Sequence, residues 1–156
     1  MQEEVLATVD ASAPRRWIGV VMLVVISVLV IYVALATPPE LAWQVFLLVI
    51  GGATLWLAQR MWSATADGLE LTATVLRTRS GRVICRIEDV VSVDRGVFAF
   101  KPSNGFLIRV ATSEGNAWAP GLWWRLGNRV GVGGVTAASK TKFMSELLTA
   151  MLSENE

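Results

Sequence analysis

The chain has 156 residues, of which 53% are hydrophobic, and its mean hydropathy is +0.51. It contains one cysteine, Cys85, and no histidine, which excludes an internal disulfide and an imidazole base, proton relay or metal ligand. From Gln59 onward there are twelve Lys and Arg against nine Asp and Glu, a net charge of +3, which is too weak to indicate a nucleic-acid partner.

Two long apolar runs predict a transmembrane hairpin over residues 17–58. The first, Trp17 to Ala36, has twenty residues without a charge, and the second extends from Leu41 to Ala58. A helix of about 20 apolar residues crosses the hydrocarbon core, where every backbone polar group needs a partner within the segment. Between the runs, Pro38 and Pro39 end the first helix because proline cannot continue it.

The charges beside the hairpin indicate its orientation. Arg15 and Arg16 precede the first run and Arg60 follows the second, whereas residues 37–40 between them carry no positive charge. Because cytoplasmic flanks of spanning helices are enriched in Lys and Arg, both termini are expected in the cytoplasm. Residues 1–16 would then form an N-terminal cytoplasmic segment.

A cleaved signal peptide is the alternative interpretation of the first run, since a basic head, an apolar core and Ala34-Leu35-Ala36 are its usual parts. Against it, the run exceeds the ~7–15 residues usual for a signal core, and Pro38 lies just beyond the supposed cleavage site. Either interpretation leaves the following domain in the cytoplasm.

Small residues gather about midway along the second run, at Gly51, Gly52 and Ala53. Small side chains allow helix backbones to approach closely. We expect this patch to pack against the first helix of the same hairpin, near Gly19 and Ser27, or against a helix of another protein.

From Asp67 the continuous apolar pattern changes to alternation, with turn residues between short segments, which predicts antiparallel β-strands. The side chains expected to face inward on the first two strands are Leu69, Leu71, Ala73 and Val75, followed after a turn by Val83, Cys85 and Ile87. Further strands are predicted at Val90–Asp94, Val97–Lys101, Phe106–Thr112 and Asn116–Trp118.

The chain ends on an amphipathic helix, predicted at about residues 139–153. Its apolar side chains recur at helical spacing: Phe143, Met144, Leu147, Leu148, Met151 and Leu152. Such a helix would cover the open end of a small bent sheet. The predicted fold class is therefore α+β, with a transmembrane hairpin followed by an antiparallel β-barrel and a capping helix.

Gly68-Leu69-Glu70-Leu71 opens the run of short strands, and Ile87-Glu88-Asp89-Val90-Val91-Ser92-Val93 follows within it. In this order, after the hairpin and before the terminal helix, these segments resemble bacterial membrane-anchored pleckstrin-homology-like domains. The resemblance covers most of the chain but not Gly121 to Gly127. It implies a cytoplasmic PH-like barrel over residues 67–156, location in the cell inner membrane and no shared catalytic residues.

Four arginines lie on the first predicted β-hairpin, Arg77, Arg79, Arg82 and Arg86. In lipid-binding pleckstrin-homology domains the equivalent hairpin supplies cations to a phosphate headgroup, so the resemblance implies contact with anionic lipid. The alternative is four solvated arginines around a turn.

Three tryptophans within seven residues form the most unusual local composition of the domain. Trp118, Trp123 and Trp124 stand close to Arg125 and Arg129. Since tryptophan prefers sites with one apolar and one wet side, this segment is expected to meet lipid or a partner protein, with core packing as the alternative.

Three other segments do not indicate catalysis. Residues 134–141 lack the glycine that precedes the lysine of a phosphate-binding loop, because Ser139 stands there. Glu88, Asp89 and Asp94 are interpreted as a solvated turn, and Cys85 as a small buried hydrophobe. We therefore expect no enzymatic activity, no cofactor, no metal and no nucleotide.

The expected function is that of a non-enzymatic, membrane-anchored binding module. It would act as an accessory or scaffolding subunit, with membrane lipids and another membrane protein or complex as partners. The alternative function is binding of an anionic lipid headgroup by the PH-like domain.

Overall fold

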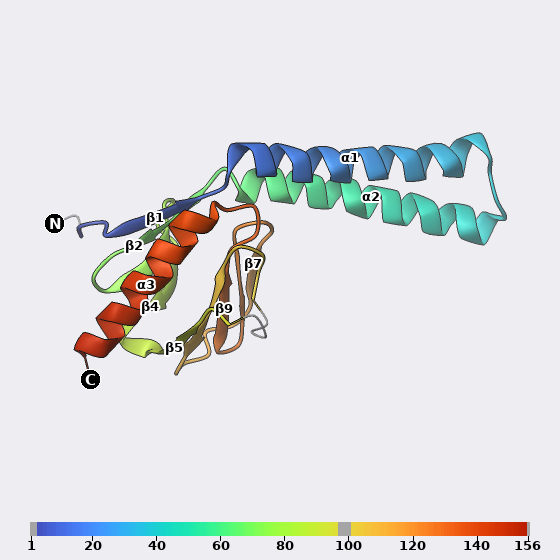
Figure 1. The fold of residues 1–156 in the computed structure, drawn as a ribbon. Coiled ribbons are helices and arrows are strands. Elements are labelled where there is room, and N and C mark those ends of the chain that lie inside the picture. Colours follow the sequence, from blue (N-terminus) through green and yellow to red (C-terminus); the bar gives the residue numbers. More distant parts are fainter. Residues whose placement is uncertain (1–2, 97–100, 156) are drawn as a thin grey trace.

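The computed structural model describes residues 3–96 and 101–155. It contains two long apolar helices, two antiparallel sheets and a C-terminal helix (Figure 1). The α+β class with an apolar helical hairpin is thus confirmed. Residues 97–100 of the strand predicted at Val97–Lys101 lie outside the described residues.

Helices α1 (Ala13–Ala36) and α2 (Leu41–Ala64) form a hairpin that extends away from the rest of the molecule (Figure 1). Each has 24 residues, a length of about 36 Å at 1.5 Å per residue. Their most apolar windows have mean hydropathies of 3.1 and 1.8, and 11% of each window is buried. By length and composition both helices can cross a hydrocarbon core of about 30 Å.

Of the predicted small-residue patch, Gly51 lies between the two helices. The Ser27 hydroxyl donates a hydrogen bond to the Gly51 carbonyl oxygen at 2.7 Å. A Cβ atom on Gly51 would lie 2.6 Å from Ile31 Cγ1, whereas a Cβ atom on Gly52 would meet nothing within 4 Å. Ala53 is also exposed. Gly19 packs on Met61 rather than on the patch.

A strand that the sequence did not predict precedes the helical hairpin. Strand β1 (Ala7–Asp10) pairs antiparallel with β2 (Gly68–Leu71), with Val9 opposite Leu69. The helical hairpin is therefore an insertion between two neighbouring strands of one sheet. Both ends of the insertion return to the same place, so the N-terminal segment belongs to the domain that follows the hairpin.

The four-stranded sheet has the order β1-β2-β3-β4, with β3 at Val75–Thr78 and β4 at Val83–Arg86. The inward-facing residues predicted here were partly wrong. The chain turns at Thr72, whose hydroxyl accepts a hydrogen bond from the Val75 amide at 3.1 Å, so Ala73 is exposed and the inward face continues at Leu76. A register shift in the β3–β4 pairing buries Ile84 beside Cys85 and leaves Val83 50% exposed.

The five-stranded sheet has the order β5-β6-β9-β8-β7. Its strands are β5 (Val90–Asp94), β6 (Phe106–Val110), β7 (Ala117–Ala119), β8 (Trp123–Leu126) and β9 (Arg129–Val132). Strands β8 and β9 were not predicted. A two-residue turn at Gly127 and Asn128 joins them, and Gly127 has φ +58°, a conformation that favours glycine.

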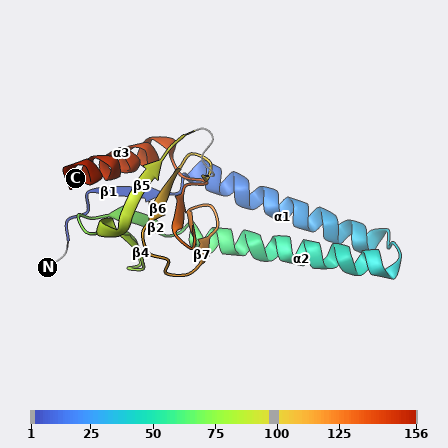
Figure 2. The same cartoon turned by 90° about the horizontal axis from the view of Figure 1, so that it is seen from below.

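The core lies between the two sheets, and helix α3 (Ala138–Glu154) closes one side of it by packing on β1, β5 and β6 (Figures 1 and 2). Met144 and Leu148 of α3 are fully buried there. Among the described residues no strand of one sheet pairs with a strand of the other, although an isolated bridge between Ala11 and Thr136 joins segments that follow β1 and β9. The predicted barrel is therefore an open pair of sheets. The 3-10 helix η1 (Ile87–Asp89) connects one sheet to the other.

Candidate functional site

The first candidate region is the base of the helical hairpin, where Arg16, Trp17, Trp62 and Thr65 meet. Arg16 Nε donates to the Thr65 hydroxyl at 2.8 Å, and its Nη2 donates to the Trp62 carbonyl oxygen at 2.7 Å. The guanidinium also lies 3.8 Å from the centroid of the Trp62 ring. Trp17 packs edge-on against that ring at 4.9 Å. Arg16 therefore ties the start of α1 to the end of α2.

The same base is joined to the domain. Arg15 Nη1 donates to the Thr136 carbonyl oxygen at 2.9 Å, and the Ser12 amide donates to the Val135 carbonyl oxygen at 2.7 Å. The Val135 amide in turn donates to the Gly121 carbonyl oxygen at 3.0 Å. A Cβ atom on Gly121 would lie 3.0 Å from Thr65 Cγ2. These contacts fix the helices and the sheets relative to each other.

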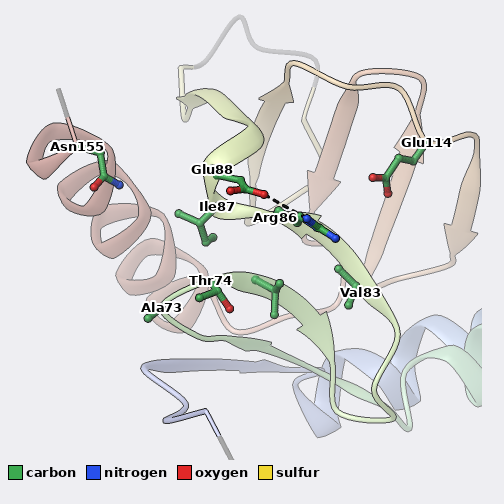
Figure 3. Close-up of a pocket in the computed structure, with 9 residues that line it drawn as sticks. Ala73, Thr74, Val83, Arg86, Ile87, Glu88, Glu114 and Asn155 are labelled. Atoms are coloured by element: carbon green, nitrogen blue, oxygen red, sulfur yellow. Dashed lines mark hydrogen bonds and ion pairs between the residues drawn. The ribbon is translucent and has the colours of Figure 1, made fainter.

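A cavity of about 610 Å³ is lined in part by η1 and the C-terminal end of α3 (Figure 3), and that end of α3 lies away from the hairpin (Figure 1). We call this cavity the distal pocket. Its lining comes from the β2–β3 turn and the start of β3, from β4, η1, the β6–β7 loop and the C-terminal end of α3: Ala73, Thr74, Val75, Val83, Arg86, Ile87, Glu88, Glu114 and Asn155. Elements distant in sequence thus converge on it.

The distal pocket combines apolar walls with charged groups. Arg86 and Glu88 form an ion pair at 3.2 Å, and both side chains are well exposed (Figure 3). Glu3 binds the hydroxyls of Thr74 at 2.6 Å and Thr72 at 2.8 Å beside the pocket, and these two hydrogen bonds lower the pKa of its carboxyl. Apolar walls with a few charged groups suit recognition of an organic or peptide group.

Of the four arginines predicted to form a lipid site, Arg77 and Arg79 meet at Glu70, whereas Arg82 and Arg86 make other contacts. Arg77 pairs with Glu70 at 3.4 Å, and Arg79 pairs with Asp10 at 2.6 Å. Arg86 lies at the distal pocket. Arg82 stands 5.4 Å from the centroid of the Trp123 ring. Three of the four cations are thus already paired with carboxylates.

Arg125 is a buried structural residue rather than a surface cation. Its Nη1 donates to the Ile84 carbonyl oxygen at 2.5 Å, which bridges β8 of one sheet to β4 of the other. It also pairs with Glu114 at 3.3 Å, while its Nε has no partner among the described residues. The neighbouring Cys85 is buried too, and this burial raises the pKa of its thiol to about 12. Cys85 is therefore a neutral thiol at physiological pH.

The three tryptophans divide between the two faces of the five-stranded sheet. Trp123 is buried in the core, on the same face as Arg125. Trp118 and Trp124 are paired across β7 and β8 on the opposite face, where Trp118 is 50% exposed. Arg129 lies exposed on β9. Trp123 and Arg125 thus belong to the core, in contrast to the surface role predicted for them.

Sequence reasoning missed two members of that outer face, Arg109 and Leu126. Both are exposed and lie beside Arg129, since Arg129 pairs with Arg109 on β6 and with Leu126 on β8. The Gly127-Asn128 turn, which places Leu126 opposite Arg129, could have located Leu126, and the alternation along Phe106–Val110 could have located Arg109.

No cluster of three or more His, Cys, Asp or Glu side chains suited to a metal ion occurs among the described residues. The sequence matches no family model, and comparison with curated proteins and with solved structures finds no match. The functional conclusion therefore depends on the site geometry of this chain alone.

Proposed function

We propose that the protein is a non-enzymatic, membrane-anchored binding module, an accessory or scaffolding subunit of a membrane protein complex. Helices α1 and α2 cross the bacterial inner membrane with both termini in the cytoplasm, and the α+β domain stands at the cytoplasmic surface. The observation that carries this proposal is the joint at the hairpin base, where Arg15 binds Thr136 and Arg16 binds Trp62. A domain held in this way has a fixed position relative to its anchor.

The arrangement of charges and aromatic rings supports the proposed topology. Arg15, Arg16 and Arg60 all lie at the end of the hairpin that meets the domain, and Trp17 and Trp62 lie at the same end. Positive charge favours the cytoplasmic side, and indole rings favour the headgroup level. We also propose that the domain is PH-like, on the resemblance of its sequence, although β1 comes from before the helical hairpin.

The distal pocket is the proposed site for the partner. It faces away from the hairpin, so it presents the half-exposed Val83 and the partly exposed Val75 to proteins at the cytoplasmic surface. A peptide segment with an apolar side chain, flanked by a polar group for Arg86 or Glu88, fits this chemistry.

The test uses the full chain, extracted from its native membrane in a mild detergent. We expect it to migrate in a larger assembly whose other subunits are identified by mass spectrometry. The Val83→Asp substitution places a charge in the pocket wall and should reduce recovery of the partner by about ten-fold, a loss of roughly 1.4 kcal/mol. Phe143→Asp is the control, because Phe143 is similarly exposed but lies on α3 outside the pocket. A chain that migrates alone contradicts the proposal.

Lipid binding by the arginines of β3 and β4 is a weaker candidate. Arg77, Arg79 and Arg86 are each paired with a carboxylate, so a phosphate would have to displace an existing partner.

A further inference from the structure

The outer face of the five-stranded sheet carries an unusual set of side chains in two cross-strand rows. One row contains Trp118, Trp124, Gly131 and Leu107 on β7, β8, β9 and β6, and the other contains Leu126, Arg129 and Arg109. Residues directly opposite each other in paired strands point to the same face. Aromatic, aliphatic and cationic side chains therefore share one continuous surface.

This surface is both apolar and positively charged. Trp118 is 50% exposed and Leu126 is 56% exposed, although a sheet face towards water is normally polar. Neither Arg109 nor Arg129 has an ion pair with any of the described residues. The acidic side chain on this face, Asp94, lies on the edge strand β5 and accepts a hydrogen bond from the Gly96 amide at 2.7 Å.

Gly131 makes the surface flat at its centre. A Cβ atom at this position would collide with the Trp124 ring, so the indole lies directly over the glycine backbone. The tryptophan is thereby laid along the sheet instead of standing out from it. A flat aromatic surface suits a flat partner.

The orientation of this face follows from how the domain joins the hairpin. The helical hairpin continues from the ends of β1 and β2, and the five-stranded sheet lies beside the base of the hairpin (Figures 1 and 2). Its outer face is turned away from the four-stranded sheet, towards the side on which α1 and α2 extend. Gly121, just after β7, lies against Thr65 at the end of α2. Only Thr65 to Asp67 separate α2 from β2, and Ala11 and Ser12 separate β1 from α1, so the face cannot swing far away.

We propose that this outer face rests on the anionic headgroups of the same membrane that the hairpin crosses. Trp118 and Leu126 enter the headgroup layer, where indole rings and partly buried aliphatic side chains are stable, and Arg109 and Arg129 contact lipid phosphates. The inference rests on the proposed insertion of α1 and α2. It adds that the domain lies flat on the bilayer, with the distal pocket directed to the cytoplasm.

The test uses the purified full chain in vesicles of phosphatidylcholine, with or without phosphatidylglycerol. Single cysteines at Leu126→Cys, Phe143→Cys and Val25→Cys receive a nitroxide spin label, and collisions with a water-soluble nickel reagent are compared with collisions with oxygen. Leu126 and Phe143 are both 56% exposed, which makes Phe143 a matched control on another surface, and Val25 reports on helix insertion. The buried Cys85 can remain in place, and the unsubstituted chain verifies that it is not labelled.

With phosphatidylglycerol present, we expect the Leu126 label to collide several-fold less with the nickel reagent than the Phe143 label does. The Arg109→Gln, Arg129→Gln double variant should abolish this difference while the Val25 label stays in lipid. Equal access at Leu126 and Phe143, with the Val25 label in lipid, overturns the inference but leaves the proposed function standing. A water-accessible Val25 label overturns both. Because no other protein is present, shielding at Leu126 cannot come from a partner of different sequence, and repeating the measurement at a tenfold lower ratio of protein to lipid separates lipid contact from contact with a second copy.

Discussion

The guanidinium of Arg16 lies 3.8 Å from the Trp62 ring centroid and binds the Trp62 carbonyl oxygen at 2.7 Å. One side chain near the start of α1 thereby holds both the ring and the backbone of α2 at its last turn. These contacts between Arg16 and Trp62 lie where the helical hairpin meets the two sheets. A change here is transmitted to the position of the whole domain.

Arg16→Ala should loosen this joint. The loss combines a cation–π contact of about 1 kcal/mol with hydrogen bonds to partly buried groups, for a total of roughly 2 kcal/mol. Limited proteolysis of the detergent-solubilised chain should then cleave near residues 65–67 faster than in the unsubstituted protein. Arg60→Ala is the control, because Arg60 lies 5.8 Å from the Trp56 ring centroid and makes no hydrogen bond to a described residue. Equal cleavage rates for the two variants would show that the Arg16 contacts do not hold the hairpin against the domain.

Arg125→Leu should destabilise the domain by about 3 kcal/mol, since it removes a buried cation that satisfies the Ile84 carbonyl oxygen and links the two sheets. The free energy of unfolding, followed by near-UV circular dichroism in denaturant, measures this loss. Arg129→Leu, four residues further on an exposed position, should change the free energy by less than about 0.5 kcal/mol. A small effect at Arg125 would mean that the sheets are held together by apolar packing alone.

The pKa of Cys85 is raised to about 12 from an ordinary value of 9.0, so this thiol makes the folded state less stable as pH rises. Below pH 9 the thiol is neutral in both folded and unfolded chains, so its contribution to stability is fully present. As pH rises from 9 towards 12 the unfolded thiol ionises first, and the folded state loses stability.

We therefore expect the drop in unfolding free energy between pH 8 and pH 10.5 to be smaller in Cys85→Ala than in the unsubstituted chain, because other groups titrate equally in both. A thiol reagent at pH 8 should modify Cys85 only after denaturation. Rapid modification of the native chain would contradict its burial.

Gly51→Leu and Gly52→Leu form a matched pair on α2. At Gly51 the new side chain meets Ile31 and the Ser27 backbone, and overpacking of this kind costs about 1–3 kcal/mol. At Gly52 the space is open, so the thermal midpoint in detergent should stay unchanged. If Gly52→Leu instead removes a co-purifying subunit while the midpoint is unchanged, that outward face of α2 contacts another protein's helix.

Parts of the fold could be predicted because their patterns are local. The helical hairpin, the C-terminal helix and strand β5 depend on runs and periodicities within one segment. Strand β5 and the C-terminal helix agree with the predicted positions closely, whereas α1 begins four residues earlier and α2 ends six residues later than the predicted apolar runs. Strand β1 was missed because its four residues have a partner some 60 residues later, and no local pattern records that pairing. Val83 was placed inside because simple alternation cannot anticipate the register shift in the β3–β4 pairing.

The candidate sites were likewise predictable where the signal is local and unpredictable where it depends on contacts between distant segments. Composition drew attention to the tryptophans and arginines between Trp118 and Arg129, but it could not distribute them between the two faces of a sheet. Strand alternation buries Trp123 and Arg125, exposes Trp118 and Arg129, and leaves Trp124 partly buried. The distal pocket had no sequence signal, because its lining comes from five separate segments.

The sequence by itself determined that two charge-free or nearly charge-free helices flank a proline turn, since apolar length and helix-breaking residues act locally. Only the tertiary structure decided that this hairpin is inserted between β1 and β2, that Arg16 and Arg15 tie it to the domain, and which cations are paired. Those outcomes depend on strand register and on contacts between residues far apart in the chain. The physical reason is that hydrophobic periodicity encodes the face an element buries but not the element against which it is buried.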